Sequence, residues 1–402
     1  MTKAAMISLS KAFAIVDREI AGISLSSELL PVRKAPGRTI AENQVSRLDL
    51  PPFDKSAVDG YAVPAGDDGP EYDVLETVPA GCVPTEVLAA GTAAKVMTGA
   101  PVPKGTGKVV MVEQTRRIEG KVRILSPSKA ANICGKGEDV RRGQVILSVG
   151  TRLGPLEIAV LISAGITEVK VFRPVRVSII STGDEIVDSP DRLAPGKIMN
   201  SNGPLLSALC NRCGLEVVDN STVADEFAAT LSAIRTALAK SDLVLLSGGV
   251  SVGDFDFVPG AMAEAGLKMH FSKVAVKPGR PMTFASSCGK AAFGLPGNPV
   301  AVYLMFCLFV LRAARRITGQ KNHVRLVTLP LGRDYRRRSA ERIAYLPCRL
   351  TRNGTIEPTE YHGTAHLQAL LGCDGLFVVP SGVTELPAGR KVDFISIRGG
   401  FE

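Results

Sequence analysis

The stretch "DLVLLSGGVSVGD" (residues 242–254) joins a short apolar run to a glycine-rich turn. The run is too short for an ordinary helix and is typical of a buried strand, and the paired glycines mark its end. Three other apolar runs end in a similar way. "VSII" leads into residues 181–185, "VAV" into residues 277–281 and "FGL" into residues 296–299.

Helical patterns alternate with these strand patterns. One helix is expected after "SNGPLL", one around "VPGAMAEAG", and a long apolar one from Pro299. Short apolar strands that alternate with helices predict an α/β domain with a mostly parallel sheet. We place this domain at residues 173–322.

The flanking regions are rich in strand patterns. Near the N-terminus, Ser8 or Ser10 can cap a helix, and "GPLEIAVLISAGI" (residues 154–166) predicts a helix that returns to the core. Strand patterns fill residues 51–127, with a hairpin turn at residues 119–121, and they return after about residue 322. The prediction is therefore a multi-domain α/β and β protein. Its N-terminal region covers residues 1–172 with a β-rich lobe inserted at about 46–135, and a small β domain covers 323–402.

Composition narrows the classes of function. The chain has 402 residues and a formal charge of +9, which favours an anionic partner such as nucleic acid, a membrane surface or a phosphorylated ligand. The basic residues are scattered and not interleaved with aromatics, which argues against nucleic acid. The longest apolar run, residues 300–311, is too short to cross a bilayer, and no signal peptide is visible. Eight cysteines without a disulfide pattern fit a reducing compartment, so we expect a cytoplasmic protein without a membrane partner.

The candidate functional residues cluster at the ends of the four predicted strands. Open α/β sheets bind ligands beyond the carboxyl ends of their strands, and glycine-rich turns there suit anions. Lys273, Lys277 and Arg280 add positive charge, and neighbouring acids are compatible with an anion when they hold a divalent cation. The pattern therefore predicts a site for phosphate or another oxyanion with Mg²⁺. It contains neither a P-loop nor a G-x-G-x-x-G fingerprint.

Eight motifs link these strand ends to the N-terminal region. They are "PPFDKSAVDGYAV" (51–63), "VMTGAPVPKG" (96–105), "GEDV" (137–140), "STGDEIV" (181–187), "NSNGPLL" (200–206), "SGGVSVGDFDF" (247–257), "VAVKPGRP" (274–281) and "LPGNPVAV" (295–302). In sequence and order they resemble the MoeA-type molybdopterin molybdenumtransferases, the family that includes the E domain of gephyrin. The resemblance covers about residues 5–305.

The resemblance implies a reaction and its partners. Such an enzyme inserts molybdate into adenylylated molybdopterin, hydrolyses the adenylate with Mg²⁺ as cofactor, and releases AMP and molybdenum cofactor. It would act as a homodimer whose cleft lies between the α/β domain of one subunit and the β-rich lobe of the other. The pterin adenylyltransferase and recipient molybdoenzymes are implied as further partners.

The resemblance also implies roles for individual residues. The expected catalytic residues are Asp59, Asp184, Glu185, Lys273 and Lys277. The expected substrate-binding residues are Thr98, Ser247, Gly248, Gly249, Lys277, Arg280, Pro281, Pro296 and Asn298. The expected metal ligands are Asp139, Asp242 and Asp256.

The chain departs from the family pattern at several positions. Cys134 replaces a basic residue, and Arg280 replaces a lysine. In the C-terminal domain Ala344 stands for an acidic residue, Pro347 for a basic one and Ala365 for a histidine. These changes leave a second hypothesis open, a pterin-binding scaffold or paralogue with weakened metal insertion. The insertase is the leading hypothesis.

Overall fold

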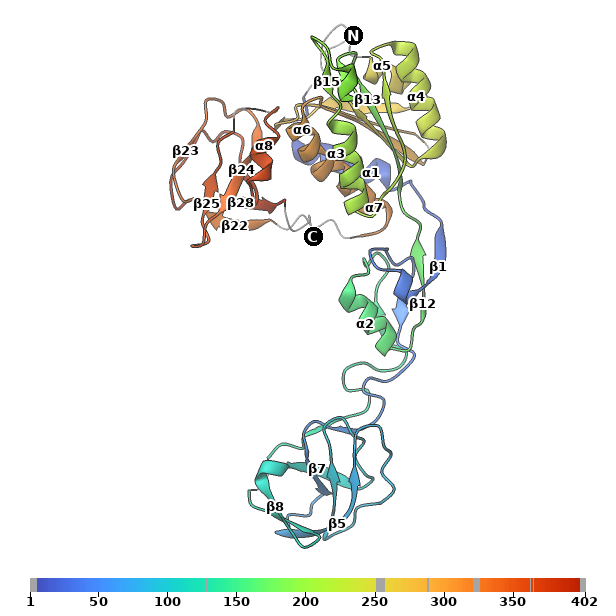
Figure 1. Cartoon of the computed structure of the whole chain (residues 1–402), viewed down its shortest axis with the longest axis vertical. Coiled ribbons are helices and arrows are strands. Elements are labelled where there is room, and N and C mark those ends of the chain that lie inside the picture. Colours follow the sequence, from blue (N-terminus) through green and yellow to red (C-terminus); the bar gives the residue numbers. More distant parts are fainter. Residues whose placement is uncertain are drawn as a thin grey trace. The chain divides into compact units, whose positions relative to one another are not determined.

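The computed structural model describes residues 6–126, 129–250, 257–287, 289–320, 326–361, 363 and 365–397. The chain divides into two compact units (Figure 1). The first unit comprises Met1–Glu28, Gly37–Ala41 and Phe172–Glu402, and the second comprises Leu29–Pro36 and Glu42–Val171.

A six-stranded sheet lies at the centre of the first unit. Four neighbouring strands are parallel, and the last two alternate in direction. In spatial order the strands are β16 (Glu216–Val223), β13 (Arg176–Thr182), β17 (Leu243–Ser247), β21 (Lys290–Leu295), β20 (Pro281–Ser287) and β18 (Lys268–Lys273). This confirms the predicted α/β domain with a mostly parallel sheet.

Helices cover both faces of this sheet. One face carries α1 (Leu9–Ile20), α3 (Asn202–Arg212), α6 (Pro299–Met305), a π-helical segment (Phe306–Val310) and α7 (Leu311–Ile317). The other face carries α4 (Phe227–Lys240) and α5 (Val258–Glu264). Among the described residues, none of the helices has the length and apolar character needed to cross a bilayer.

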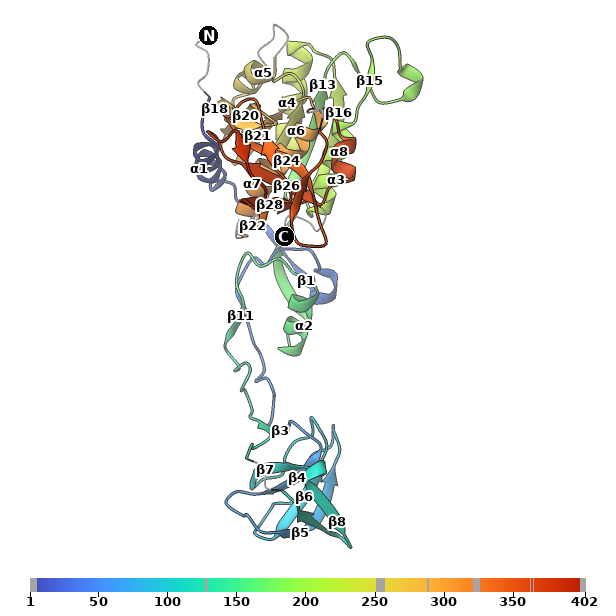
Figure 2. The same ribbon diagram turned by 90° about the vertical axis from the view of Figure 1, so that its left-hand side faces the viewer.

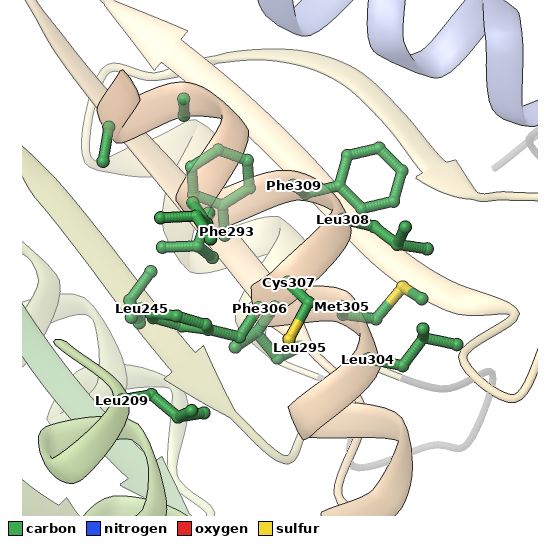
Figure 3. Close-up of a cluster of buried hydrophobic side chains, with 14 of the residues drawn as sticks. Leu209, Leu245, Phe293, Leu295, Leu304, Met305, Phe306, Cys307, Leu308 and Phe309 are labelled. Carbon is green, nitrogen blue, oxygen red and sulfur yellow. The ribbon is translucent and has the colours of Figure 1, made fainter. Parts of the chain in front are cut away.

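Alternate residues of each central strand supply the two cores. In β17, Leu243 and Leu245 pack toward α3 and α6, whereas Val244 and Leu246 pack toward α4 and α5. Figure 3 shows the first core, where Leu245 gathers with aromatic residues of the helix that follows β21. A strand that is buried on both faces must be apolar throughout, which explains why the short apolar runs predict this sheet.

Helix α1 begins where the sequence predicts it. Ser8 is its N-cap, and its hydroxyl accepts a hydrogen bond from the Lys11 backbone N–H at 3.2 Å. Ala12, Val16 and Ile20 are fully buried, because residues three to four apart share one face of a helix.

The C-terminal residues build a second sheet within the first unit. Its strands, in spatial order, are β19 (Val276–Lys277), β24 (Ile343–Leu350), β26 (Gly375–Val379), β28 (Lys391–Ser396) and β22 (Val327–Pro330). β25 (Ile356–Pro358) pairs with β24, β23 (Tyr335–Arg336) pairs with β27 (Glu385–Leu386), and α8 (Gln368–Leu371) precedes β26. Figure 2 shows this region with β24, β26 and β28 toward the viewer.

The strand β19 corrects one expectation. The "VAV" run was expected to be a strand of the α/β sheet, but Val276 and Lys277 pair in parallel with Ile343 and Ala344 of β24. The α/β sheet uses β18 instead, which ends at Lys273. The sequence of β18, KMHFSK, is mostly polar, so it lacks the apolar run by which the other strands of this sheet were recognised.

The second unit contains a six-stranded sheet. In spatial order its strands are β7 (Thr106–Met111), β4 (Gly60–Pro64), β6 (Thr92–Val96), β5 (Glu71–Val78), β9 (Lys121–Ile124) and β8 (Thr115–Ile118). Short pairs are also formed by β3 (Lys55–Ser56) with β10 (Ile133–Cys134), β2 (Gln44–Val45) with β11 (Val145–Leu147), and β1 (Ser27–Pro31) with β12 (Glu168–Phe172). The six-stranded sheet lies within the predicted lobe at about 46–135, whose exact boundaries stay a prediction.

Two local features of the second unit bear on the sequence predictions. The hairpin between β8 and β9 turns at Glu119 and Gly120, whose φ angles of 41° and 85° suit a two-residue turn. Helix α2 (Pro155–Ser163) confirms the helix predicted within residues 154–166. It packs on the 3₁₀ turn Val32–Lys34 and on β11, and Leu161 is its one fully buried residue.

Candidate active site

The carboxyl ends of β13, β17 and β21 lie side by side at one edge of the α/β sheet. Ser247, the last residue of β17, pairs with Ser181 of β13 and with Leu295 of β21. The structure therefore brings the residues that follow these strands together. They include Asp184, Glu185, Gly248, Gly249, Pro296 and Asn298, all of which the sequence predicted for one site.

The turn after β17 requires glycine at two successive positions. Gly248 and Gly249 have φ angles of 98° and 61°. A Cβ atom on Gly248 would lie 2.3 Å from the backbone oxygen of Thr182, and one on Gly249 would lie 2.9 Å from Val258 Cγ2. The two glycines are therefore required because this turn packs closely against Thr182 at the end of β13 and Val258 at the start of α5.

We expect Gly248→Ala to lower the free energy of unfolding by about 2–4 kcal/mol, because it combines an unfavourable φ with a steric overlap. Gly266→Ala is the matched control, since Gly266 has a φ of 87° but open space around the added methyl. Urea denaturation would measure both variants. Equal losses would show that the backbone at Thr182 yields freely to the added methyl.

Three cations lie at the same edge. β18 runs in the same direction as the parallel strands, and its last residue, Lys273, pairs with Pro281 at the start of β20. Lys277 and Arg280 are exposed in the segment that joins these strands. None of the three cations forms an ion pair with a carboxylate in the described part of the chain. Their charge is therefore available to an anionic ligand.

The acids at this edge suit a metal ion that arrives with phosphate. Asp184 and Glu185 are exposed, and Asp184 Oδ1 accepts a hydrogen bond from the Asp225 backbone N–H at 3.1 Å. Within the described residues, no three His, Cys, Asp or Glu side chains gather as a metal site made of protein alone. Mg²⁺ is commonly held by one or two protein carboxylates together with substrate phosphates. Asp184 and Glu185 can provide such carboxylates. The predicted ligand Asp256 lies outside the described residues.

Asp242 lies away from this edge. It precedes β17, at the opposite end of the strand from Ser247. Its carboxylate accepts hydrogen bonds from Arg173 Nη1 and Nη2 at 2.6 and 2.8 Å, and from the Arg176 backbone N–H at 2.8 Å. Burial raises the pKa of Asp242, but these hydrogen bonds outweigh it and hold the pKa below its ordinary value. This position does not support the expectation that Asp242 binds a metal.

The second unit holds the remaining predicted residues. Asp59 directly precedes β4, and its Oδ1 accepts hydrogen bonds from the Thr98 backbone N–H at 2.6 Å and from Thr98 Oγ1 at 2.8 Å. These two bonds lower the pKa of Asp59, so the carboxylate is ionised at neutral pH. Thr98 thus contacts Asp59, a role that its predicted place in substrate binding did not include. Asp139 is exposed, and its backbone N–H donates to the Leu50 carbonyl.

Sequence patterns alone assign no role to Asn202, because asparagine at a helix start is ordinarily a cap. In the structure it is the first residue of α3 and lies among the strand ends. Its Nδ2 donates to Ser247 Oγ at 2.8 Å and to the Gly297 carbonyl at 2.6 Å. The "NSNGPLL" motif contains this residue, but only the fold shows which strand ends it reaches.

Comparison with known protein families matches nearly the whole chain. Residues 7–165 match the MoeA N-terminal region (domain I and II), residues 178–316 a probable molybdopterin binding domain, and residues 328–397 the MoeA C-terminal region (domain IV). A molybdopterin molybdenumtransferase of Staphylococcus aureus (strain Mu50) is 35% identical over 383 residues, which cover 92% of this chain and 91% of the relative. One from Staphylococcus epidermidis is 34% identical over 370 residues, 89% of this chain and 88% of the relative.

Solved structures agree with this result. A crystal structure of the molybdopterin biosynthesis MoeA protein from Pyrococcus horikoshii OT3 matches 98% of this chain and 100% of its own, with 30% identity and a TM-score of 0.84. With the glycine-lined, cationic strand edge, these likenesses define a class: multi-domain transferases built around a molybdopterin-binding α/β domain. The chain belongs to the molybdopterin molybdenumtransferase family, whose members act in molybdenum cofactor biosynthesis.

Proposed function

We propose that the protein inserts molybdate into adenylylated molybdopterin, with Mg²⁺-dependent hydrolysis of the adenylate and release of AMP and molybdenum cofactor. One observation carries this proposal. The glycine-only turn at Gly248 and Gly249 shares its sheet edge with three cations that have no ion-pair partner among the described carboxylates. That combination supports a ligand with several anionic oxygens, which both molybdate and an adenylate pyrophosphate possess.

The residues of the α/β edge would bind and orient the substrates. Lys273, Lys277 and Arg280 would hold the oxygens of molybdate or phosphate, and the glycine turn would let the backbone approach the pterin phosphate. Asp184 and Glu185 would hold Mg²⁺ together with the substrate. When bound, Mg²⁺ would neutralise charge at the pyrophosphate that is cleaved.

Asp59 would act as the base. Thr98 fixes its Oδ1, and Oδ2 makes no hydrogen bond with any described residue, so Oδ2 can accept a proton from water. A carboxylate with a lowered pKa stays in the proton-accepting form over the neutral range.

The test uses purified protein with adenylylated molybdopterin, molybdate and Mg²⁺, and it measures released AMP and molybdenum-loaded cofactor. We expect both products, with AMP release lost when Mg²⁺ is chelated. Pterin binding without either product would overturn the proposal.

The second candidate is a pterin-binding paralogue with weakened metal insertion. The observation that favours it is the pairing of Lys277 with Ala344, because an acidic side chain expected beside that lysine is replaced by a methyl group. Tight pterin binding with AMP release but little molybdenum transfer would identify this candidate.

We also propose that the protein works as a cytoplasmic homodimer that receives its substrate from a pterin adenylyltransferase and delivers the product to molybdoenzymes. The family resemblance supports this. Light scattering would give the mass of the assembly, and a single-chain mass of 42.4 kDa at working concentration would contradict the dimer.

A further inference from the structure

The side chain of Asn202 joins three elements of the α/β domain. It begins α3, and its Nδ2 donates to Ser247 Oγ after β17 and to the Gly297 carbonyl after β21. A carbonyl can only accept a hydrogen bond, so the nitrogen must face Gly297 and the orientation of the amide is fixed. The residue is 7% exposed, which shields both hydrogen bonds from water.

Two longer contacts also join the two turns. Ser247 Oγ approaches the Pro296 carbonyl at 3.4 Å, the long end of hydrogen-bond distance. The Gly248 backbone N–H donates to the Leu295 carbonyl at 3.3 Å. The bonds of the Asn202 carboxamide to the two turns, at 2.8 and 2.6 Å, are shorter than either of these.

Two buried oxygens beside these turns have no partner in the part of the chain that the structure describes. Asn202 Oδ1 and Thr182 Oγ1 have no hydrogen bond among the described residues. A Cβ atom on Gly249 would lie 3.0 Å from Thr182 Oγ1, which places that hydroxyl directly against the glycine turn. Burial of a polar atom without a hydrogen-bond partner destabilises the fold by about 1–3 kcal/mol. A ligand that donates hydrogen bonds to these oxygens would remove this cost.

We propose that Asn202 is a positioning residue that sets the spacing between the turns at residues 247–249 and 296–298, so that both contact one ligand. The identity of the ligand rests on the proposed function, whereas the bracing of the turns is a property of the ligand-free protein. The unpartnered Oδ1 supports the proposal, because a carboxamide used only as a structural link would have both of its ends satisfied.

The first test measures hydrogen–deuterium exchange in the ligand-free protein. Asn202→Ala is expected to accelerate exchange of the Gly248 amide, which donates to the Leu295 carbonyl, by about tenfold or more, which corresponds to the loss of one to two net hydrogen bonds. Asn211→Ala is the matched control, because Asn211 is exposed in the last turn of the same helix. Unchanged exchange of the Gly248 amide in Asn202→Ala would overturn the proposal.

The second test separates bracing from simple packing. Asn202→Asp keeps the size of the side chain but sets a carboxylate oxygen against the Gly297 carbonyl, so we expect it to be at least as harmful as Asn202→Ala. Both variants should raise KM for adenylylated molybdopterin by about 10–100-fold and change kcat by less than about threefold. A fall in kcat with an unchanged KM, or a harmless Asn202→Asp, would contradict a positioning role.

A second variant, Ser247→Ala, tests the same hydrogen bonds. If Asn202→Ala fails to fold, Ser247→Ala removes only one of the two hydrogen bonds of Asn202 and should accelerate exchange of the Gly248 amide by a smaller factor. No change in that exchange would count against the proposal. If the wild-type protein releases no AMP, the proposed function fails. The exchange measurement then still decides whether Asn202 braces the turns.

Discussion

Replacing Asp59 by Asn is expected to lower kcat for AMP release by about 10²–10⁴-fold, the usual contribution of a general base. The carboxamide has the size of the carboxylate, and its oxygen can still accept the two hydrogen bonds from Thr98. What it loses is the charge and the ability to accept a proton at neutral pH. The measurement is single-turnover release of AMP from adenylylated molybdopterin with Mg²⁺ and molybdate.

Asp54→Asn is the matched control for Asp59. Asp54 lies five residues earlier in the same segment, but its Oδ1 accepts a hydrogen bond from the Lys136 backbone N–H at 2.7 Å, which is a structural contact. We expect this variant to keep kcat within about threefold of wild type. An Asp59→Asn variant with comparable activity would exclude Asp59 as the base.

Replacing Asp242 by Ala is expected to lower the free energy of unfolding by about 3 kcal/mol without altering the Mg²⁺ dependence of activity. The side chain of Asp242 is only 12% exposed. Its loss removes the carboxylate partner of Arg173, whose Nη1 keeps its hydrogen bond to the Pro174 carbonyl, and removes the acceptor of the Arg176 N–H. Removal of one partner from a buried ion pair costs about 3–5 kcal/mol. The low end applies because Arg173 remains 24% exposed.

The effect of Asp242 should depend on pH. Its pKa lies below the ordinary value in the folded protein, so its contribution is present above about pH 4 and is lost as the pH falls through the folded pKa. Urea denaturation should therefore show a difference between wild type and Asp242→Ala that is largest near neutral pH and shrinks in acid. Glu264→Ala is the control, because its pair with Arg235 is exposed and long at 3.9 Å and should change stability by less than about 1 kcal/mol. A changed Mg²⁺ requirement would restore Asp242 as a metal ligand.

The sequence predicts the α/β domain well because its strands are buried on both faces. An apolar run such as residues 243–247 identifies a buried strand even when its neighbouring strands in the sheet are unknown. The glycine-rich turn that follows the run marks the edge of the sheet where the site lies. The gathering of Ser247, Gly248 and Pro296 at one edge follows directly from parallel strand direction.

Other features depend on which strands pair, and a sequence pattern does not contain that information. Val276 has the same apolar surroundings whether it joins one sheet or the other, so the place of β19 was not predictable. Asp242 looks like an available acid until Arg173, 69 residues earlier, is seen to bind it. Asn202 looks like a helix cap for the same reason, because its two acceptors lie 45 and 95 residues away.

The pairing of β19 with β24 bears on how this protein can evolve. In the chain, the segment that carries Lys277 follows β18 and precedes β20, which are both strands of the α/β sheet, but it pairs with β24 of the C-terminal sheet. The two regions therefore share a continuous piece of backbone and are not separable modules. If C-terminal domains were exchanged between relatives, the new domain would have to provide a strand that pairs with Val276 and Lys277. Otherwise the backbone at Lys277 would lose its β-pairing. A substitution at Ala344 or its neighbours therefore changes residues that pair directly with the segment carrying Lys277. Substitutions in the C-terminal sheet and in the segment around Lys277 should accordingly be correlated among relatives.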